Sequence, residues 1–501
     1  MESYFDAFRN GVIGLETEIL TPHNGWRRIV YADWTASGRN YEPIERRIQQ
    51  DVMPYVANTH SEMSTTGSAM TYIYHHAQQV IRRHVNANSD DVLITAGSGM
   101  TRVINKFQRL LGIRHKDHGR ISTKDRPVVF ISHMEHHSNH ISWLETTAIL
   151  EIIRPTPGGQ VDLEHLRELL TKYEDHKVKF ASVTACSNVT GIVTPYHEIA
   201  ALMHEHDAYC FVDFACSAPY VLIDMHPARE DERLDAVFFS PHKFLGGPGS
   251  SAVLVFNRCL YKQNVPDHPG GGCVDWTNPW GKVLYMQDIE SREDGGTPAF
   301  LQTVKSALCI RLKDEMGVNN ILARERQLFK IVWNRLRRIP GIRLLQPDQT
   351  ERLGIISFCV DGLHHNLATR MLNDQFGIQC RGGCSCAGTY GHHLLGINQE
   401  ESESIANAIE RRDASRKPGW IRISLHPVMT DAEAIFIGDS VAELAQSHSQ
   451  WTKHYIFDPS RNYITTVDSK LDYHIKSKMD EVLSTRFTGR VLRNPLVEMS
   501  G

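Results

Sequence analysis

Short apolar runs alternate with stretches of helical periodicity along residues 46–305. Runs such as residues 237–240 and 252–256 are rich in aromatic and β-branched side chains, as buried strands are. Strands that alternate with helices form mostly parallel sheets, and the ligands of such sheets bind beyond the carboxyl ends of the strands. The pattern therefore predicts an α/β fold with a binding site where these strands end.

The same pattern divides the chain into four parts. Residues 1–45 hold a short strand and a small-residue loop, and residues 46–305 form a large domain. Residues 306–445 form a smaller C-terminal domain, which is entered through one long helix predicted over residues 300–336. Residues 446–501 carry several aromatic side chains, so we expect this extension to be ordered and packed.

Composition and charge describe an ordinary globular protein. Of the 501 residues, 41% are apolar and 22% are charged, and the net charge is −4. This balance gives no electrostatic reason to bind nucleic acid or membranes, and no apolar run approaches ~20 residues. The first residues lack the basic and apolar segments of a leader, so we expect a cytoplasmic protein. Ten scattered cysteines do not form a disulfide framework.

Lys243 stands just after a predicted buried strand, in the sequence Ser-Pro-His-Lys, and a Gly-Gly-Pro-Gly turn follows shortly. Partial burial lowers the pKa of a lysine and makes its amine nucleophilic. Such an amine suits a Schiff base with an aldehyde cofactor. The alternative is a surface lysine beside a turn.

A second predicted strand, residues 208–213, ends in Asp213 upstream of Lys243. A buried carboxylate needs a partner. The pyridine nitrogen of pyridoxal phosphate would be one, because an aspartate keeps it protonated and makes the ring an electron sink. The alternative for Asp213 is a helix N-cap, but an acid and then a lysine, each at a strand end, favour pyridoxal phosphate.

These motifs resemble those of class V aminotransferase-fold enzymes of the cysteine desulfurase and selenocysteine lyase group. That group carries its lysine in Ser-x-His-Lys and its acid in Val-Asp-x-Ala-Gln, and matching motifs run from about Tyr31 to Asp431. The resemblance implies a fold-type-I pyridoxal-phosphate-dependent transferase, with a mostly parallel sheet in the large domain and a smaller α+β C-terminal domain. Cys216 departs from the family, because it replaces the usual glutamine and is a weak donor for the cofactor's phenolic oxygen.

The resemblance also implies which residues hold the cofactor. A Gly-Ser-Gly turn between a predicted strand and helix, residues 93–101, is a weak anion-site signal alone, but the family places its phosphate loop there. The family lays the histidine that follows a glutamate flat on the pyridine ring, which selects His136 over its neighbour His137. The implied cofactor residues are Ser98, Gly99, His136, Asn188, Asp213, Ala215, Ser240, His242 and Lys243. Thr297, in Gly-Gly-Thr-Pro, would reach the phosphate of a neighbouring subunit, which implies a homodimer.

A cysteine loop, for which the candidate in this chain is residues 377–391, distinguishes desulfurases from aminotransferases on this fold. The family's Arg-x-Gly-x-x-Cys-Ala pattern implies that Cys386 attacks the substrate sulfur, and exposure beside Arg381 favours its thiolate form. Cys384 is an additional thiol that could relay or resolve a persulfide. If the loop is extended, the side chains of Cys384 and Cys386 point the same way, and a small shift would exchange their roles.

The cysteine loop has two other interpretations. The small residues could simply pack a tight turn. Alternatively, Cys380, Cys384 and Cys386 could bind a metal together with His392 or His393, but this is not a standard zinc spacing, so we expect no metal site.

Arg422 lies in a predicted strand, residues 419–427, that resembles the family's carboxylate clamp, and a guanidinium fork suits a carboxylate. The family places further substrate contacts around Ala36 and Asn58. An acidic helical insert, residues 399–410, lies between the cysteine loop and Arg422 and is a candidate gate or acceptor-binding element.

Together the motifs predict a pyridoxal-phosphate-dependent cysteine desulfurase that converts L-cysteine to L-alanine. Its catalytic residues would be Lys243, Cys386 and His136, and its partners an amino-acid substrate and a sulfur-acceptor protein. The alternatives are a selenocysteine lyase, a C–S β-lyase, an aminotransferase or an epimerase, in which the cysteine loop is structural. A binding or scaffold protein on the same fold is the non-enzymatic alternative.

Overall fold

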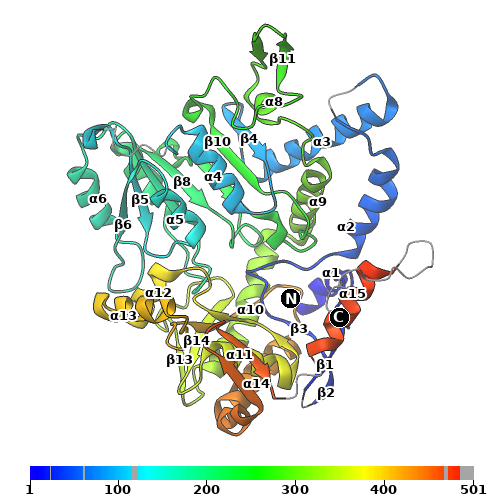
Figure 1. Ribbon diagram of the computed structural model, residues 1–501, viewed down its shortest axis with the longest axis vertical. Helices are drawn as coiled ribbons and strands as arrows, with labels where there is room; N and C mark the ends of the chain where they lie inside the picture. Colours follow the sequence, from blue (N-terminus) through cyan, green and yellow to red (C-terminus); the bar gives the residue numbers. More distant parts are fainter. Residues whose placement is uncertain (23, 60–61, 115–121, 468–471, 486–501) are drawn as a thin grey trace.

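Two sheets organise the chain (Figure 1). The computed structural model describes residues 1–22, 24–59, 62–114, 122–467 and 472–485. The larger sheet has seven strands in the order β4 (Asp91–Thr95), β10 (Val253–Asn257), β9 (Ala236–Phe239), β8 (Tyr209–Asp213), β7 (Lys179–Thr184), β5 (Val128–Ser132) and β6 (Ile149–Ile153). Only β10 runs antiparallel to its neighbours, so the carboxyl ends of the other six strands share one edge. The predicted α/β fold is confirmed.

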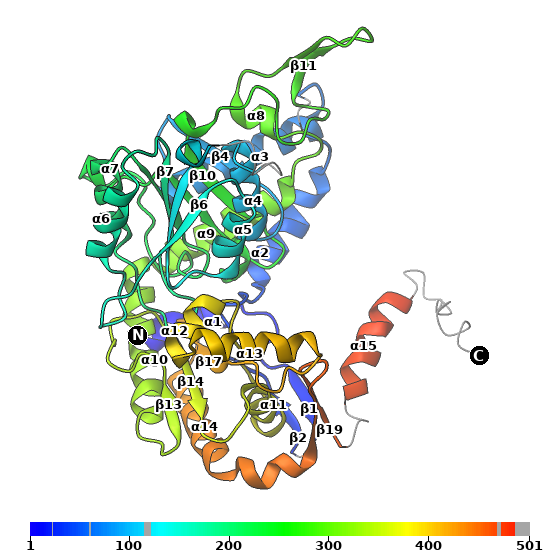
Figure 2. The same ribbon diagram turned by 60° about the vertical axis from the view of Figure 1, so that its left-hand side comes forward.

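Helices cover both faces of this sheet, since its strands alternate apolar side chains between them. Along β5, Val129 and Ile131 join one apolar cluster and Phe130 joins another. Helices α4 (Met100–Leu110) and α5 (His137–Leu144) pack in the first cluster, and α6 (Leu163–Lys172) and α7 (Tyr196–Glu205) in the second. The remaining elements of this part are α3 (Thr65–His84), α8 (Ile289–Glu293), α9 (Phe300–Met316) and a projecting hairpin of β11 (Val274–Thr277) and β12 (Val283–Tyr285), which Figure 2 shows.

The smaller domain is built on a four-stranded antiparallel sheet. Its strands follow the order β13 (Ile342–Leu344), β14 (Ile355–Val360), β17 (Trp420–Ser424) and β16 (Arg381–Gly383). Its helices are α10 (Val318–Leu336), α11 (His365–Phe376), α12 (Gly388–Leu395), α13 (Gln399–Glu410) and α14 (Asp431–Trp451). The single helix predicted over residues 300–336 is wrong, because Gly317 adopts a φ of 75° and separates α9 from α10.

The predicted extension begins inside α14 and continues as a hairpin of β18 (Tyr455–Asp458) and β19 (Tyr463–Thr466). Ile464 is buried, and Asn366 of α11 donates to the Asn462 carbonyl oxygen at 3.2 Å. The helix α15 (Asp472–Ser484) follows, and residues 468–471 and 486–501 of the extension lie outside the described residues. Within the described ranges, none of the helices has the length and apolar character needed to span a membrane.

The N-terminal segment connects the two domains. It contains α1 (Glu2–Arg9), β1 (Glu18–Thr21), β2 (Gly25–Arg28), β3 (Val30–Tyr31) and α2 (Glu42–Arg47). Strand β3 pairs in parallel with β15 (Ile378–Gln379), which leads into the cysteine loop. Seven residues later (38 − 31), the Gly38 amide donates to the His242 carbonyl oxygen at 2.9 Å, beside Lys243. The N-terminal segment therefore runs from the cysteine loop to the turn that carries Lys243, which we call the lysine turn.

We expect Gly38→Ala to destabilise the fold at this junction. A β-carbon at Gly38 would lie 1.9 Å from the Phe244 carbonyl oxygen, so the segment or the lysine turn must shift. Overpacking of this kind costs about 1–3 kcal/mol of unfolding free energy. Denaturant unfolding should show the loss, whereas Gly271→Ala, where a β-carbon meets open space, should not. Equal stability of the two variants would contradict this expectation.

Candidate active site

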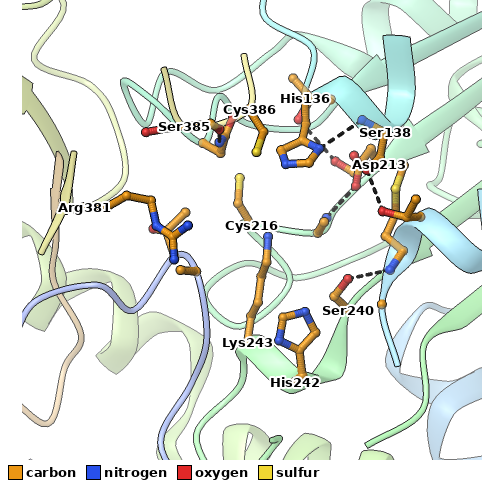
Figure 3. A pocket seen from close by; sticks show the side chains of 18 of the residues that line it. His136, Ser138, Asp213, Cys216, Ser240, His242, Lys243, Arg381, Ser385 and Cys386 are labelled. Carbon is orange, nitrogen blue, oxygen red and sulfur yellow. Dashed lines mark hydrogen bonds between the residues drawn. The ribbon is translucent and has the colours of Figure 1, made fainter. Parts of the chain in front are cut away.

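A cavity of about 230 Å³ lies between the carboxyl ends of the large sheet and the cysteine loop of the small domain (Figure 3). Most of the residues selected from the sequence line it. They are Ala36, Gly99, His136, Asn188, Asp213, Ala215, Ser240, His242, Lys243, Cys386 and Arg422. Folding therefore gathers residues from the N-terminal segment and both domains around one space.

Lys243 ends a short 3-10 turn, Pro241–Lys243, directly after β9. A β-carbon at Gly247 would lie 1.8 Å from the Pro241 carbonyl oxygen, so the following turn requires glycine there. Burial lowers the pKa of Lys243, while the neighbouring Cys216 and Asp213 oppose that effect. The amine is thereby made more nucleophilic, as the sequence suggests.

Asp213 is the last residue of β8 and is 2% exposed. Its Oδ1 accepts a hydrogen bond from the Ala215 amide at 2.8 Å. Burial raises the pKa of this carboxyl to about 6, although the amide and Lys243 pull it down. A cationic group in the cavity would be a suitable partner for the buried acid.

His136 lies at the amino end of α5 and lines the cavity, whereas His137 faces away from it. The Nδ1 of His136 accepts from the Ser138 amide at 3.1 Å. Burial and the nearby Lys243 lower the pKa of His136 to about 3, so its ring is neutral near pH 7. The preceding Glu135 is buried and holds the segment by accepting from the Thr184 amide at 2.8 Å.

Hydroxyl groups and a helix amino terminus gather at one end of the cavity. The Ser240 hydroxyl accepts from the Met100 amide, the first of α4, at 2.8 Å. A β-carbon at Gly99 would enter this space and lie 3.8 Å from the His242 Nε2. The hydroxyls of Thr101 and Ser138, 2.6 Å apart, complete the group. This donor set suits a phosphate.

Sequence reasoning missed Thr101 and Ser138, and it selected Ser98, which is exposed and does not line the cavity. Thr101 is the second residue of α4, and this position at the start of the helix that follows the predicted phosphate loop is a signal that could have indicated it. Asn58 and Thr297 are likewise exposed and outside the cavity. Their proposed roles stay predictions, and that of Thr297 requires a second chain.

Arg422 of β17 is 2% exposed and reaches the cavity from the small domain. Its Nη2 donates to Asp33 Oδ1 at 2.8 Å and its Nη1 to the Asn188 carbonyl oxygen at 3.0 Å. Its buried Nε has no hydrogen-bond partner among the described residues. Arg381 donates to Asp33 Oδ2 at 3.0 Å, so one carboxylate joins two guanidinium groups. Asp33 is a third residue, after Thr101 and Ser138, that the sequence did not indicate.

The cysteine loop is a left-handed turn, in which Ser385 and Cys386 have φ values of 51° and 57°. This backbone region is unfavourable for residues other than glycine, and neighbouring groups hold it. The Asn188 side-chain amide donates to the Ser385 carbonyl oxygen at 2.8 Å, and the His137 amide donates to that of Cys386 at 2.7 Å.

The turn separates the two thiols. Cys386 is exposed and lines the cavity that contains Lys243, whereas Cys384 lines a different cavity of about 280 Å³ with Trp420. The expectation that Cys384 and Cys386 point the same way is wrong, because it assumed an extended loop.

The remaining interpretation of the cysteine loop is a metal site. Over the residues described above, no group of three or more His, Cys, Asp or Glu side chains is arranged to hold a metal ion. Both ring nitrogens of His392 already contact other groups, the Gly388 carbonyl oxygen and the Ser402 hydroxyl, each at 2.8 Å.

The chain is similar to known cysteine desulfurases. A probable cysteine desulfurase of Staphylococcus epidermidis is 28% identical over 367 residues, which are 72% of this chain and 84% of the relative. One from Staphylococcus aureus is 28% identical over 375 residues, or 74% and 86% of the two chains.

Solved structures show the same fold. The apo cysteine desulfurase of Thermococcus onnurineus has a TM-score of 0.68 at 21% identity and covers 84% of this chain and 95% of its own. A cysteine desulfurase of Escherichia coli has a TM-score of 0.68 at 20% identity, with coverages of 89% and 98%. The sequence model of the family described as aminotransferase class-V matches residues 30–435. Because this match includes most of the chain and every residue of the cavity, the protein belongs to the aminotransferase class-V family and is a pyridoxal-phosphate-dependent enzyme.

Proposed function

We propose that the protein is a cysteine desulfurase that converts L-cysteine to L-alanine and keeps the sulfur as a persulfide on Cys386. The observation that carries this proposal is that the exposed Cys386 thiol and the Lys243 amine line one cavity, although they come from different domains. A thiol in this place is what distinguishes sulfur removal from transamination. The names of the similar proteins support the same reaction.

The residues of the cavity fit pyridoxal phosphate. The phosphate of the cofactor would bind at the amino end of α4, beside Thr101, Ser138 and Ser240. The Lys243 amine would bond to the aldehyde carbon of the cofactor. Asp213 would face the ring nitrogen of the cofactor, and the neutral His136 would lie against the cofactor ring. When bound, the cofactor supplies an electron sink for the negative charge that develops at the substrate α-carbon.

The arginine pair would bind the substrate carboxylate. Arg422 is fixed by Asp33 and by the Asn188 carbonyl oxygen, and its unpartnered Nε leaves capacity for another anionic oxygen. Arg381 reaches the same Asp33 from the edge of the cavity. Two cations that share one carboxylate keep net positive charge at the site, which attracts a second carboxylate.

Lys243 and Cys386 would perform the proton and sulfur steps. The Lys243 amine, whose pKa is lowered by burial, takes the proton from the substrate α-carbon. The Cys386 thiolate attacks the substrate sulfur, so that a sulfur–sulfur bond forms as the carbon–sulfur bond breaks. A proton then replaces sulfur on the β-carbon, and the net change is cysteine plus one thiol to alanine plus one persulfide.

The proposal includes a homodimer and a sulfur acceptor. Thr297 is exposed outside the cavity, so it would contribute to phosphate binding only in another subunit. Its turn is joined to the base of the β11–β12 hairpin, where the Gly296 amide donates to the Gly271 carbonyl oxygen at 2.7 Å. The hairpin exposes Trp276 and Trp280, by 60% and 87%, as a surface for a second copy. The exposed Cys386 would pass its sulfur to an acceptor.

Cofactor affinity should fall as the pH is lowered through about 6. Burial raises the pKa of Asp213 to about 6, so its negative charge is present above this pH and lost below it. Absorbance titration of apoprotein with pyridoxal phosphate from about pH 8 to about pH 5 measures the effect. Asp213→Asn should bind weakly throughout and lose the pH step. Asp314→Asn, which removes an acid outside the cavity, should keep it, and a step retained in Asp213→Asn would contradict the assignment.

Cys386→Ala should abolish persulfide formation from L-cysteine but leave the cofactor spectrum intact, because cofactor binding needs no thiol. Cys384→Ala is the matched control and should form persulfide in the first turnover, since Cys384 faces the other cavity. Single-turnover labelling with ³⁵S-cysteine and peptide mapping separates the two variants. Normal labelling of Cys386→Ala, or alanine formation without any labelled thiol, would refute the desulfurase proposal.

A further inference from the structure

Cys216 is a second thiol in the active-site cavity, in the place where the family resemblance expects glutamine. It lines the cavity together with Lys243 and Cys386. Figure 3 shows the sulfur atoms of Cys216 and Cys386 pointing toward one another from opposite walls. The two thiols therefore face each other although they lie 170 positions (386 − 216) apart in the sequence.

The position of Cys216 is fixed by its surroundings. It is 4% exposed, and its thiol donates to the Cys186 carbonyl oxygen at 2.9 Å. Cys186 itself is fully buried behind it. Cys216 is thus held as an inner thiol, whereas Cys386 is exposed at the outer side.

Two arginine side chains line the cavity that contains the two sulfur atoms. Arg422 and Arg381 line it together with Cys216 and Cys386. Arg422 is 2% exposed, and its Nε has no partner among the described residues. These guanidinium groups would stabilise the negative charge of a persulfide in the cavity.

We propose that Cys216 accepts the sulfane sulfur from Cys386, so that one chain carries sulfur at two sites. This inference rests on the proposed desulfurase function, which first loads Cys386. Because the two thiols face each other in Figure 3, a persulfide on Cys386 would carry its outer sulfur into the space between them.

The transfer balances without an oxidant. The Cys216 thiolate attacks the outer sulfur of the Cys386 persulfide, and a new sulfur–sulfur bond forms as the old one breaks. Cys386 leaves with the electron pair as a thiolate and takes up the proton that Cys216 released. The outcome is a persulfide on the buried Cys216 and a free Cys386 that is ready for another substrate.

The number of sulfur atoms per chain tests this transfer. Holoenzyme is treated with excess L-cysteine in the absence of acceptor, and protein-bound sulfane sulfur is measured by cyanolysis. Wild type and Cys384→Ala should each hold about two sulfur atoms, Cys216→Ala and Cys216→Ser about one, and Cys386→Ala none. Peptide mapping should locate the second sulfur on Cys216. About one sulfur in wild type, all of it on Cys386, would overturn the inference and leave the desulfurase function standing.

Loading with inorganic polysulfide makes the test independent of the enzymatic reaction. If L-cysteine loads no thiol, the proposed function fails. Polysulfide that loads Cys386 would still show whether sulfur moves on from Cys386 to Cys216. Mild oxidation of wild-type protein with diamide tests the geometry without any substitution. It should give a disulfide between Cys216 and Cys386, and a disulfide between Cys384 and Cys386 alone would overturn the facing arrangement.

Discussion

The carboxylate of Asp33 holds the site together, because it pairs with Arg422 and Arg381 at once. Removing one partner from a buried ion pair costs about 3–5 kcal/mol, since the remaining charge is left without compensation. Asp33 belongs to the N-terminal segment, Arg381 begins β16 at the cysteine loop and Arg422 lies in β17. One charged group thus ties three segments of the chain to one wall of the cavity.

Burial shifts several titratable groups of the cavity toward their neutral forms. Burial lowers the pKa of Lys243, lowers those of His136 and His242 to about 3 and about 4, and raises that of Asp213 to about 6. A neutral lysine is a nucleophile and base, and a neutral imidazole can lie against a cationic ring. Such a constellation of shifted groups in one cavity is typical of an enzyme active site.

The cysteine loop adopts a conformation that costs energy locally. Two successive residues, Ser385 and Cys386, occupy the left-handed region, and bonds from Asn188 and His137 stabilise them. The same turn directs Cys386 into the cavity and Cys384 into another. Asn188 accordingly connects the loop and Arg422, because its amide donates to one and its carbonyl oxygen accepts from the other.

The sequence alone determined the α/β fold through its strand periodicity, and motifs that resemble those of a known family placed Lys243, Asp213 and His136 near the ends of parallel strands around the cavity. It did not indicate Asp33, Thr101 or Ser138, whose roles depend on contacts with residues distant in the chain. It also wrongly treated the cysteine loop as extended and α9 and α10 as one helix. Only the tertiary structure decided the direction of each thiol, since that direction follows from a left-handed turn that distant side chains hold in place.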